Sequence, residues 1–330
     1  MHFLCGLCGK LHLKMKQLKI VFMGTPEFAV PMLEVLVKSE HEVVGVITAP
    51  DKPAGRGMQL VESDIKKYAV EHQLNILQPE KLKNPDFITE LRALNADLFV
   101  VVAFRMLPEV VWSMPPMGTI NLHASLLPQY RGAAPINWAM INGEKETGVT
   151  TFFIQQEIDT GKIIYQEKVT IRDDENVGEL YHELMELGAK VLGKTVDAIA
   201  EGNYPQIPQD HITDIKHAPK IFKETCKIDW NKDVEYIYNF IRGLSPYPAA
   251  FTELEGKLFK IYKATRQHTG IAQYPTGSAA TDSKKILRFF ASDGYIDVLE
   301  CQIEGKKRIG VEDFLRRYAS TSLPEGMISL

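Results

Sequence analysis

The first two-thirds of the chain alternate short apolar runs, typical of buried strands, with segments whose apolar residues recur at helical spacing. The strand candidates are residues 18–22, 43–48, 97–103, 118–123, 148–154 and 163–169. The helix candidates are residues 27–38, 63–72 and 176–200, the second with Ser63 as its N-cap and the third ending at Gly202. Such alternation predicts an α/β fold, with a Rossmann-like, mainly parallel sheet and helices on both faces.

The character of the sequence changes after this region. Proline and polar residues dominate Tyr204–Lys223, where no apolar periodicity survives, and we expect a linker over residues 206–223. Beyond it, strand-like pieces at 250–254, 259–263, 287–290 and 296–299 are separated by glycine-containing turns. This pattern predicts a smaller C-terminal β-barrel of the OB-like kind. The expected division is an extension at 1–14, a catalytic domain at 15–205, the linker, and the barrel at 224–330.

Length and composition fit two ordinary domains. Domains usually hold about 100–200 residues, and this chain has 330. Its hydrophobic fraction of 45% and net charge of -4 neither indicate nor exclude a nucleic-acid partner. No apolar run approaches the ~18 residues that a membrane helix needs. Four cysteines are too few for a disulfide scaffold, which favours a reducing, cytoplasmic compartment.

The N-terminal residues carry one motif without a clear function. Cys5 and Cys8 form a C-x-x-C, but no second Cys/His pair follows at a zinc-like spacing. Residues 1–13 have no basic region and no cleavage site of a signal peptide. Met15 directly precedes the first strand, so we expect residues 1–14 to be either a dispensable extension or the result of a misplaced start codon.

Asn121 and His123 lie two residues apart at the end of a predicted strand. Side chains alternate between the faces of a strand, so these two share one face while Leu122 points into the core. The chain then leaves the strand, and Pro135 is well placed to begin the next helix. In open α/β sheets, ligands bind beyond the carboxyl ends of the strands, which is where this polar pair lies.

Asp159 follows in an Asp-Thr-Gly sequence, in a predicted turn between two strands of the same sheet. Its carboxylate could reach back to His123. Taken singly, such a histidine is usually structural and such an aspartate usually forms a turn. Together with Asn121, and without a neighbouring Ser or Cys nucleophile, they suit direct acyl transfer to an amine, which needs oxyanion donors and routes for protons.

Longer motifs carry a resemblance to one family. They are N-L-H-A-S-L-L-P-Q-Y-R-G-A-A-P from Asn121, N-G-E-x-x-T-G-V-T from Asn142, I-V-F-M-G-T-P-E-F-A from Ile20 and I-R-G-L-S-P-Y-P from Ile241. With the Asp-Thr-Gly at Asp159, they make the chain similar to the formyltransferases that use 10-formyltetrahydrofolate. The P-A-G-R-G loop at 53–57 and the C-terminal half resemble the branch of this family that modifies tRNA.

The resemblance implies a reaction and its residues. A formyl group would pass from 10-formyltetrahydrofolate to the α-amine of methionine on initiator tRNA, with no metal, in support of translation initiation. Asn121 and His123 would polarise the formyl oxygen, and Asp159 would keep His123 charged and move protons through a water. The folate site would be lined by Ser125, Leu126, Leu127, Pro128 and Phe104.

The resemblance also implies how tRNA binds. The loop Asp51–Gly57 would enter the acceptor end, where the cations of Lys52 and Arg56 suit phosphates. The simpler interpretation of this loop is a solvated turn. A monomer without membrane contact is expected. Residues 103–108 are one residue shorter than in many members, which leaves the detail of the pterin pocket near Phe104 open.

Other functions remain as alternatives. Relatives that formylate an amino sugar on a nucleotide share the Asn–His–Asp core but lack the P-A-G-R-G loop. A non-catalytic tRNA- or folate-binding module would not need all three of Asn121, His123 and Asp159. A nicotinamide-dependent dehydrogenase is disfavoured, because the first strand ends in M-G-T-P rather than in G-x-G-x-x-G.

Overall fold

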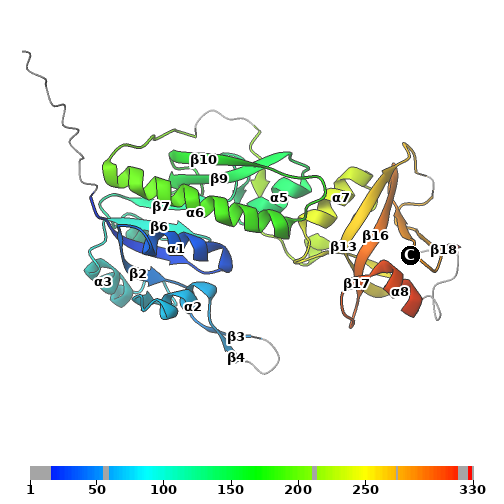
Figure 1. Cartoon of the computed structure of the whole chain (residues 1–330), viewed down its shortest axis with the longest axis horizontal. Helices are drawn as coiled ribbons and strands as arrows, with labels where there is room; N and C mark the ends of the chain where they lie inside the picture. Colours follow the sequence, from blue (N-terminus) through cyan, green and yellow to red (C-terminus); the bar gives the residue numbers. More distant parts are fainter. Residues whose placement is uncertain (1–15, 55–58, 210–213, 273, 319–325, 329–330) are drawn as a thin grey trace, which may run out of the picture.

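The computed structural model describes residues 16–54, 59–209, 214–272, 274–318 and 326–328. Figure 1 shows two halves along the long axis, with the N-terminal half in blue to green and the C-terminal half in yellow to red. The predicted extension at 1–14, with Cys5 and Cys8, lies outside the described residues, as does Arg56. Within the described ranges, no helix is long and apolar enough to cross a membrane.

A seven-stranded sheet forms the centre of the first half, in the order β10-β9-β7-β6-β1-β2-β5. Its strands are β1 (Lys19–Gly24), β2 (Glu42–Ile47), β5 (Ile76–Leu77), β6 (Leu98–Val102), β7 (Thr119–His123), β9 (Glu146–Phe153) and β10 (Ile163–Thr170). The strands from β7 to β5 pair in parallel, and β9 and β10 continue the sheet antiparallel. The predicted mainly parallel sheet is confirmed.

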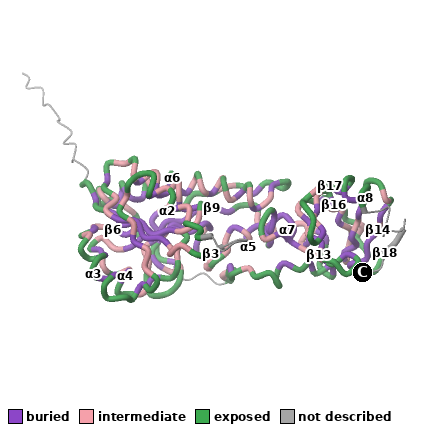
Figure 2. Tube along the Cα trace, turned by 90° about the horizontal axis from the view of Figure 1, so that it is seen from below, coloured by how far each residue is buried: buried purple, intermediate pink, exposed green. Residues whose placement is uncertain are grey.

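Helices cover both faces of this sheet, as predicted. They are η1 (Glu27–Ala29), α1 (Val30–Val37), α2 (Asp64–Glu71), α3 (Pro85–Ala93), α4 (Glu109–Trp112), α5 (Pro135–Ile141) and α6 (Val177–Glu201). Side chains of α1 and α6 share a core cluster with Ile20 and Phe22, whereas α3 and α4 share one with Val21 and Met23. Alternate residues of β1 thus enter opposite layers, which explains its continuous apolar run. Figure 2 shows this sheet region as the buried centre of the first half.

Two helix boundaries follow the expected capping chemistry. The Ser63 hydroxyl accepts the backbone N–H of Lys66 at 3.1 Å and begins α2. Helix α6 begins with a capping box between Asn176 and Glu179 and ends at Gly202, whose φ of 69° is in the left-handed region that glycine adopts readily. The long helix therefore has satisfied ends and lies across the sheet (Figure 1).

The second half is a curled antiparallel sheet in the order β12-β13-β16-β15-β14-β18, with β17 paired to β16. Its elements are β12 (Ala250–Leu254), β13 (Lys257–His268), β14 (Ala279–Thr281), β15 (Leu287–Phe290), β16 (Gly294–Ile303), β17 (Ile309–Gly310), β18 (Gly326–Ile328), η2 (Glu224–Cys226), α7 (Val234–Gly243) and α8 (Val311–Tyr318). Phe259, Phe289 and Phe314 fill its core. Strands β12 and β18 form the two edges, so the predicted barrel is an open half-barrel that α8 covers (Figure 1).

Helix α7 was not among the expected elements, although its sequence carries a signal. The Asp233 side chain accepts the backbone N–H of Tyr236 at 2.7 Å and caps the helix. The apolar residues Val234, Ile237 and Ile241 then recur at helical spacing and are buried. Glycine-containing turns further along the chain favour short strands, so the sequence pattern after residue 223 predicted strands and no helix before them.

The segment that connects the halves contains ordered pairings. Strand β11 (His217–Ala218) lies within the predicted linker and pairs in parallel with β8 (Arg131–Gly132), just after β7. Upstream, Ile207 forms an antiparallel bridge with Ile163 at the start of β10. These pairings tie residues of the connection to the loops at the carboxyl ends of the strands.

Candidate active site

The end of β7 presents the predicted polar pair. β7 lies between β6 and β9, and Asn121 and His123 point to one side while Leu122 enters the main core cluster. The side chain of Asn121 has no hydrogen-bond partner within the described ranges, and it lines a cavity. Its amide is thus available to a bound molecule. Leu122 is buried in that cluster, as the predicted alternation requires.

His123 is buried and held in one orientation. Its Nε2 lies 2.8 Å from the carbonyl oxygen of Tyr130. Because a carbonyl oxygen only accepts, Nε2 carries the proton of this bond. Nδ1 then faces Asp159, with 3.8 Å between Nδ1 and Oδ2. This separation exceeds a hydrogen bond, but it keeps the carboxylate beside the ring nitrogen that can exchange a proton.

Asp159 lies in the turn between β9 and β10, as predicted. Its φ of 55° is in the left-handed region, which non-glycine residues adopt only where the surroundings hold them. The backbone N–H of Gly132 donates to Asp159 Oδ2 at 3.0 Å. This bond and the contact with His123 bring the β7, β8 and β9–β10 segments together at one carboxylate.

A cavity of about 700 Å³ opens beside these three residues. Its walls come from the loop after β6, the start of α5, the loop after β9, and two residues near the end of β1. The lining side chains include Phe28, Phe104, Asn121, His123, Asp159 and Tyr181. A mostly apolar wall with a few convergent polar groups is typical of a small-molecule binding site.

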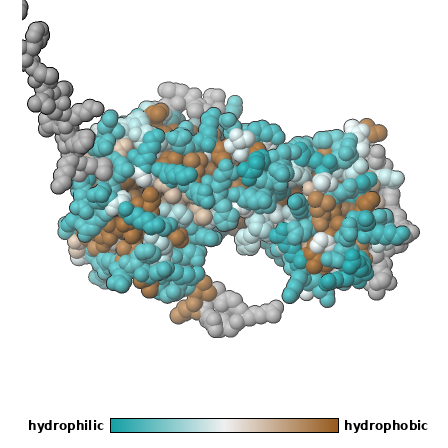
Figure 3. Space-filling view, viewed as in Figure 1, coloured by the Kyte–Doolittle hydropathy of each residue, from teal (hydrophilic) through white to brown (hydrophobic). Residues whose placement is uncertain are grey.

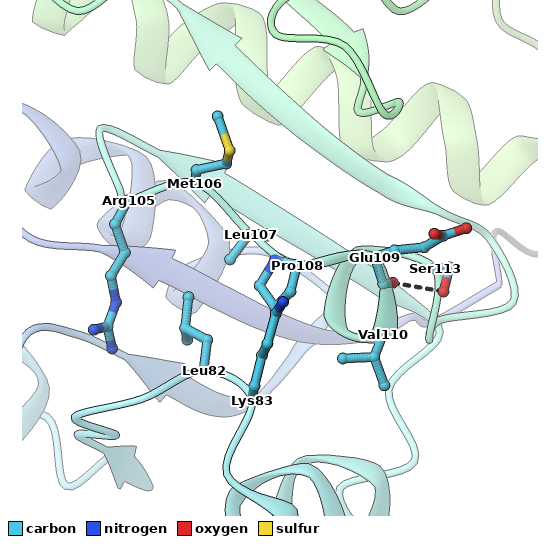
Figure 4. A pocket seen from close by; sticks show the side chains of 9 residues that line it. All are labelled: Leu82, Lys83, Arg105, Met106, Leu107, Pro108, Glu109, Val110 and Ser113. Atoms are coloured by element: carbon cyan, nitrogen blue, oxygen red, sulfur yellow. Dashed lines mark hydrogen bonds between the residues drawn. The ribbon is translucent and has the colours of Figure 1, made fainter.

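A shallower groove lies on the other side of the loop after β6. Residues 105–107 line both hollows, and Figure 4 shows Lys83 and Glu109 on the outer one. The guanidinium of Arg105 is tied to the carbonyl oxygens of Pro79 and Glu80. The loop between the two hollows is therefore anchored at Arg105.

Four of the residues expected at the folate site lie beside the cavity rather than in its wall. The Ser125 hydroxyl donates to the carbonyl oxygen of Gln129 at 2.7 Å, and the Leu127 N–H donates to Thr150 Oγ1 at 3.2 Å. Leu127 packs against Phe152, which lines the cavity. Among Ser125, Leu126, Leu127, Pro128 and Phe104, the cavity wall contains Phe104. Contact of the other four with folate stays a prediction.

The loop expected to bind tRNA starts from a hairpin that projects from the first half. β3 (Lys52–Ala54) pairs with β4 (Gln59–Val61), and the chain between them lies outside the described residues. Lys52 is exposed. Figure 3 shows brown, hydrophobic atoms where this hairpin leaves the body, and Leu60 is 68% exposed there. The base is fixed by Asp51, which accepts from Gln78 at 2.9 Å and pairs with Lys66.

Two residues near the site were not singled out from the sequence. Gly132 holds the Asp159 carboxylate through its backbone, and Gln209 holds the Asp159 backbone through its side chain. Gly132 stands in the Y-R-G part of the motif that starts at Asn121, so a signal for it existed. Gln209 belongs to the connecting segment, where nothing in the sequence marks it. Within the described ranges, no group of three His, Cys, Asp or Glu side chains gathers as metal ligands would.

Comparison with known protein families identifies the family to which this chain belongs. The family model Formyl transferase matches residues 18–196, and the model Formyl transferase, C-terminal domain, matches residues 220–319. The chain therefore belongs to the formyl transferase family, as the sequence motifs predicted.

Similar sequences include methionyl-tRNA formyltransferases of bacteria. Methionyl-tRNA formyltransferase of Bacteroides fragilis is 54% identical over 320 residues, which cover 94% of this chain and 98% of that protein. Methionyl-tRNA formyltransferase of Phocaeicola vulgatus is 56% identical over 316 residues, with 93% and 97% covered.

Solved structures share the fold at lower identity. An N-formyltransferase from Helicobacter canadensis, in complex with folinic acid and dTDP-3-aminofucose, has a TM-score of 0.64 at 22% identity and covers 86% of this chain and 99% of its own. HypX from Aquifex aeolicus, in complex with tetrahydrofolic acid, has a TM-score of 0.61 at 17% identity, with 95% and 51% covered. At these identities the likeness extends to the fold alone.

Proposed function

We propose that this chain transfers a formyl group from 10-formyltetrahydrofolate to the α-amine of methionine on initiator tRNA. One observation carries the proposal. Asn121, His123 and Asp159 meet at one cavity, in a chain that is 54% identical over nearly its whole length to a methionyl-tRNA formyltransferase. The cavity volume of about 700 Å³ is within the usual range of about 300–1,000 Å³ for small-molecule sites.

The three side chains divide the chemistry. The Asn121 amide N–H donates to the formyl oxygen, which becomes an oxyanion when the amine nitrogen bonds to the formyl carbon. His123 donates its Nε2–H to the Tyr130 carbonyl, so the second donor at that oxygen is the Nδ1–H of the doubly protonated ring. Each such donor is typically worth about 10²–10³ in rate.

Asp159 takes the proton that the attacking amine must lose. The bond from the formyl carbon to the folate nitrogen then breaks, and that nitrogen receives the proton that Asp159 took from the amine. The Asp159 carboxylate lies beside His123 Nδ1, so a proton can pass between these two groups through a water. The products are the formylated amine and tetrahydrofolate.

The remaining parts of the chain are proposed to bind substrates. Residues 15–205 form the catalytic domain, 206–223 connect, and 224–330 bind tRNA. Lys52 and Arg56 contact phosphates of the acceptor end, while Phe104 and the turn Ser125–Pro128 contact the folate. We further propose that the protein acts as a monomer in the cytoplasm.

The test is a choice between acceptors. Purified protein receives 10-formyltetrahydrofolate with either charged methionyl initiator tRNA or a nucleotide-linked amino sugar, and the formylated product is measured. The proposal predicts rapid transfer to the tRNA and none to the sugar. Transfer to the sugar, or hydrolysis of the folate without an acceptor, would reject the proposed substrate while keeping formyl chemistry at the site.

A further inference from the structure

The side-chain amide of Gln209 is buried, and both of its hydrogen bonds as a donor go to the turn that contains Asp159. Its Nε2 donates to the backbone carbonyl of Asp159 at 3.0 Å and to that of Gly161 at 2.7 Å. Its Oε1 accepts from Nη2 of Arg131 at 2.8 Å. Gln209 as a whole is only 8% exposed, so these bonds do not compete with much water.

The turn needs such a support because its backbone is unusual. Asp159 has a φ of 55°, and sparsely populated conformations of this kind typically cost about 1–3 kcal/mol. Gly161 is so close to the backbone of Phe153 that an added Cβ would overlap with its carbonyl oxygen. Gln209 bonds to the carbonyls on both sides of residue 160. It therefore fixes the turn in the conformation that aims the Asp159 carboxylate at His123.

The same amide joins the turn to the strand that holds the carboxylate. Arg131 precedes Gly132 in β8, and the Gly132 N–H donates to Asp159 Oδ2. Gln209 thus links the backbone of Asp159 to the strand that binds its side chain. Two backbone bonds between Ile163 and Ile207, at 2.8 and 2.9 Å, hold the segment before Gln209 against β10.

We propose that Gln209, carried by the segment connecting the two halves, is a positioning residue that sets the Asp159 carboxylate beside His123. This inference rests on the proposed function, because it assumes that Asp159 takes part in formyl transfer. It makes the connection between the halves a part of the active site. A carboxylate displaced by about 1 Å can lose on the order of 10² in rate.

The test compares two substitutions with a matched control. Gln209→Glu keeps an acceptor for Arg131 but loses both donors, and Gln209→Met keeps the length without hydrogen bonds. Both should lower kcat about 10–100-fold and leave KM for folate and for tRNA within about threefold, since substrate contacts are unchanged. Gln206→Glu makes the same chemical change at an exposed side chain of the same segment and should keep wild-type kcat.

The pH dependence of kcat distinguishes loss of a positioning hydrogen bond from general damage to the fold. The carboxyl introduced by Gln209→Glu faces the Arg131 guanidinium, which favours its ionised form, and in that form it offers the turn no donor. Protonation at lower pH restores a donor, so the ratio of its kcat to the wild-type kcat should rise as the pH falls from 7 toward 5, whereas the ratio for Gln209→Met should stay flat. A flat ratio for both variants would contradict the role of the donated bonds.

A double-mutant cycle with Asp159→Asn distinguishes a failure of the inference about Gln209 from a failure of the proposed function. The asparagine keeps its backbone carbonyl, so the bonds from Gln209 persist. If Gln209 acts through Asp159, Gln209→Met should slow the Asp159→Asn variant far less than it slows the wild type. An equal slowing in both, or wild-type kcat for both Gln209 variants, overturns the inference alone. Wild-type activity of Asp159→Asn would instead overturn the proposed function.

Discussion

Gly132→Ala should disable the site by moving the strand that binds the Asp159 carboxylate. Gly132 has a φ of 125°, and an added Cβ would lie 2.5 Å from the carbonyl oxygen of Ala218 in β11. Ordinary contacts of this kind begin near 3.4 Å, so β8 and β11 must separate by roughly 1 Å. That carbonyl also accepts the N–H groups of Ala133 at 2.7 Å and Ala134 at 3.2 Å, so these bonds stretch as well.

The size of the effect follows from these distances. The backbone conformation costs about 1–3 kcal/mol for a residue with a Cβ, and a weakened hydrogen bond adds about 1 kcal/mol. We therefore expect the free energy of unfolding of the first half to fall by about 2–4 kcal/mol. A shift of about 1 Å in the Gly132 N–H, now 3.0 Å from Asp159 Oδ2, should lower kcat about 10²-fold.

The assay is steady-state formyl transfer combined with urea unfolding. Gly305→Ala is the matched control, because Gly305 also has a positive φ, 74°, but an added Cβ there would meet no atom within 4 Å. It should cost about 1 kcal/mol of stability and leave kcat unchanged. A kcat for Gly132→Ala within about threefold of wild type, or an equal loss in Gly305→Ala, would refute the reasoning.

Three further predictions concern other parts of the chain. Lys52→Ala and Arg56→Ala should each raise KM for tRNA and leave KM for folate unchanged. Each should also reduce the slope of log binding constant against log salt concentration by about one, because one phosphate contact is lost. Equal slopes for wild type and variants would exclude the loop from the tRNA site. Ser63→Ala should lower the free energy of unfolding by about 1 kcal/mol in urea titrations, because it removes the N-cap bond of α2. Backbone N–H groups of residues 284–286 lower the pKa of Asp282 to about 2 from 3.8. The charge of Asp282 therefore stabilises the fold above about pH 3.8, and this stabilisation is lost as the pH falls toward 2. Asp282→Asn should have a lower free energy of unfolding than wild type at pH 7, and the difference should shrink below pH 4. A difference that stays constant with pH would contradict this prediction.

The sequence contained enough to predict the end of β7. Period-two alternation fixed the directions of Asn121, Leu122 and His123, and the architecture of parallel sheets fixed their location at the carboxyl edge. The turn at Asp159 was also predictable, because it lies between two clear strand patterns. These features depend on local periodicity and on general rules of sheet topology, both of which can be read from residues alone.

The support of the site could not be predicted in the same way. Strands β8 and β11 contain two residues each, and they pair across more than eighty positions of sequence. Segments this short have no periodicity, so only the tertiary fold decides that they meet. Gln209 could not be identified from the sequence for the same reason. Its role depends on hydrogen bonds to the carbonyls of Asp159 and Gly161, which only the tertiary fold brings next to it.

The turn after β7 illustrates a different limit. Family motifs predicted that Ser125–Pro128 contact folate, but sequence gives no distance between a motif and a cavity wall. In the structure Leu127 supports Phe152 from behind, and Phe152 lines the cavity. A motif can thus shape a pocket from a neighbouring layer.

The most direct test of the account is single-turnover formyl transfer to methionyl initiator tRNA by wild type and by His123→Ala, at saturating 10-formyltetrahydrofolate. His123 is oriented by the Tyr130 carbonyl and lies 3.8 Å from the Asp159 carboxylate, so its loss removes a donor at the oxyanion and a step in proton transfer. We predict that the transfer step slows by about 10²-fold or more while both substrates still bind. A transfer rate within about threefold of wild type would contradict the proposal that this site carries out the reaction.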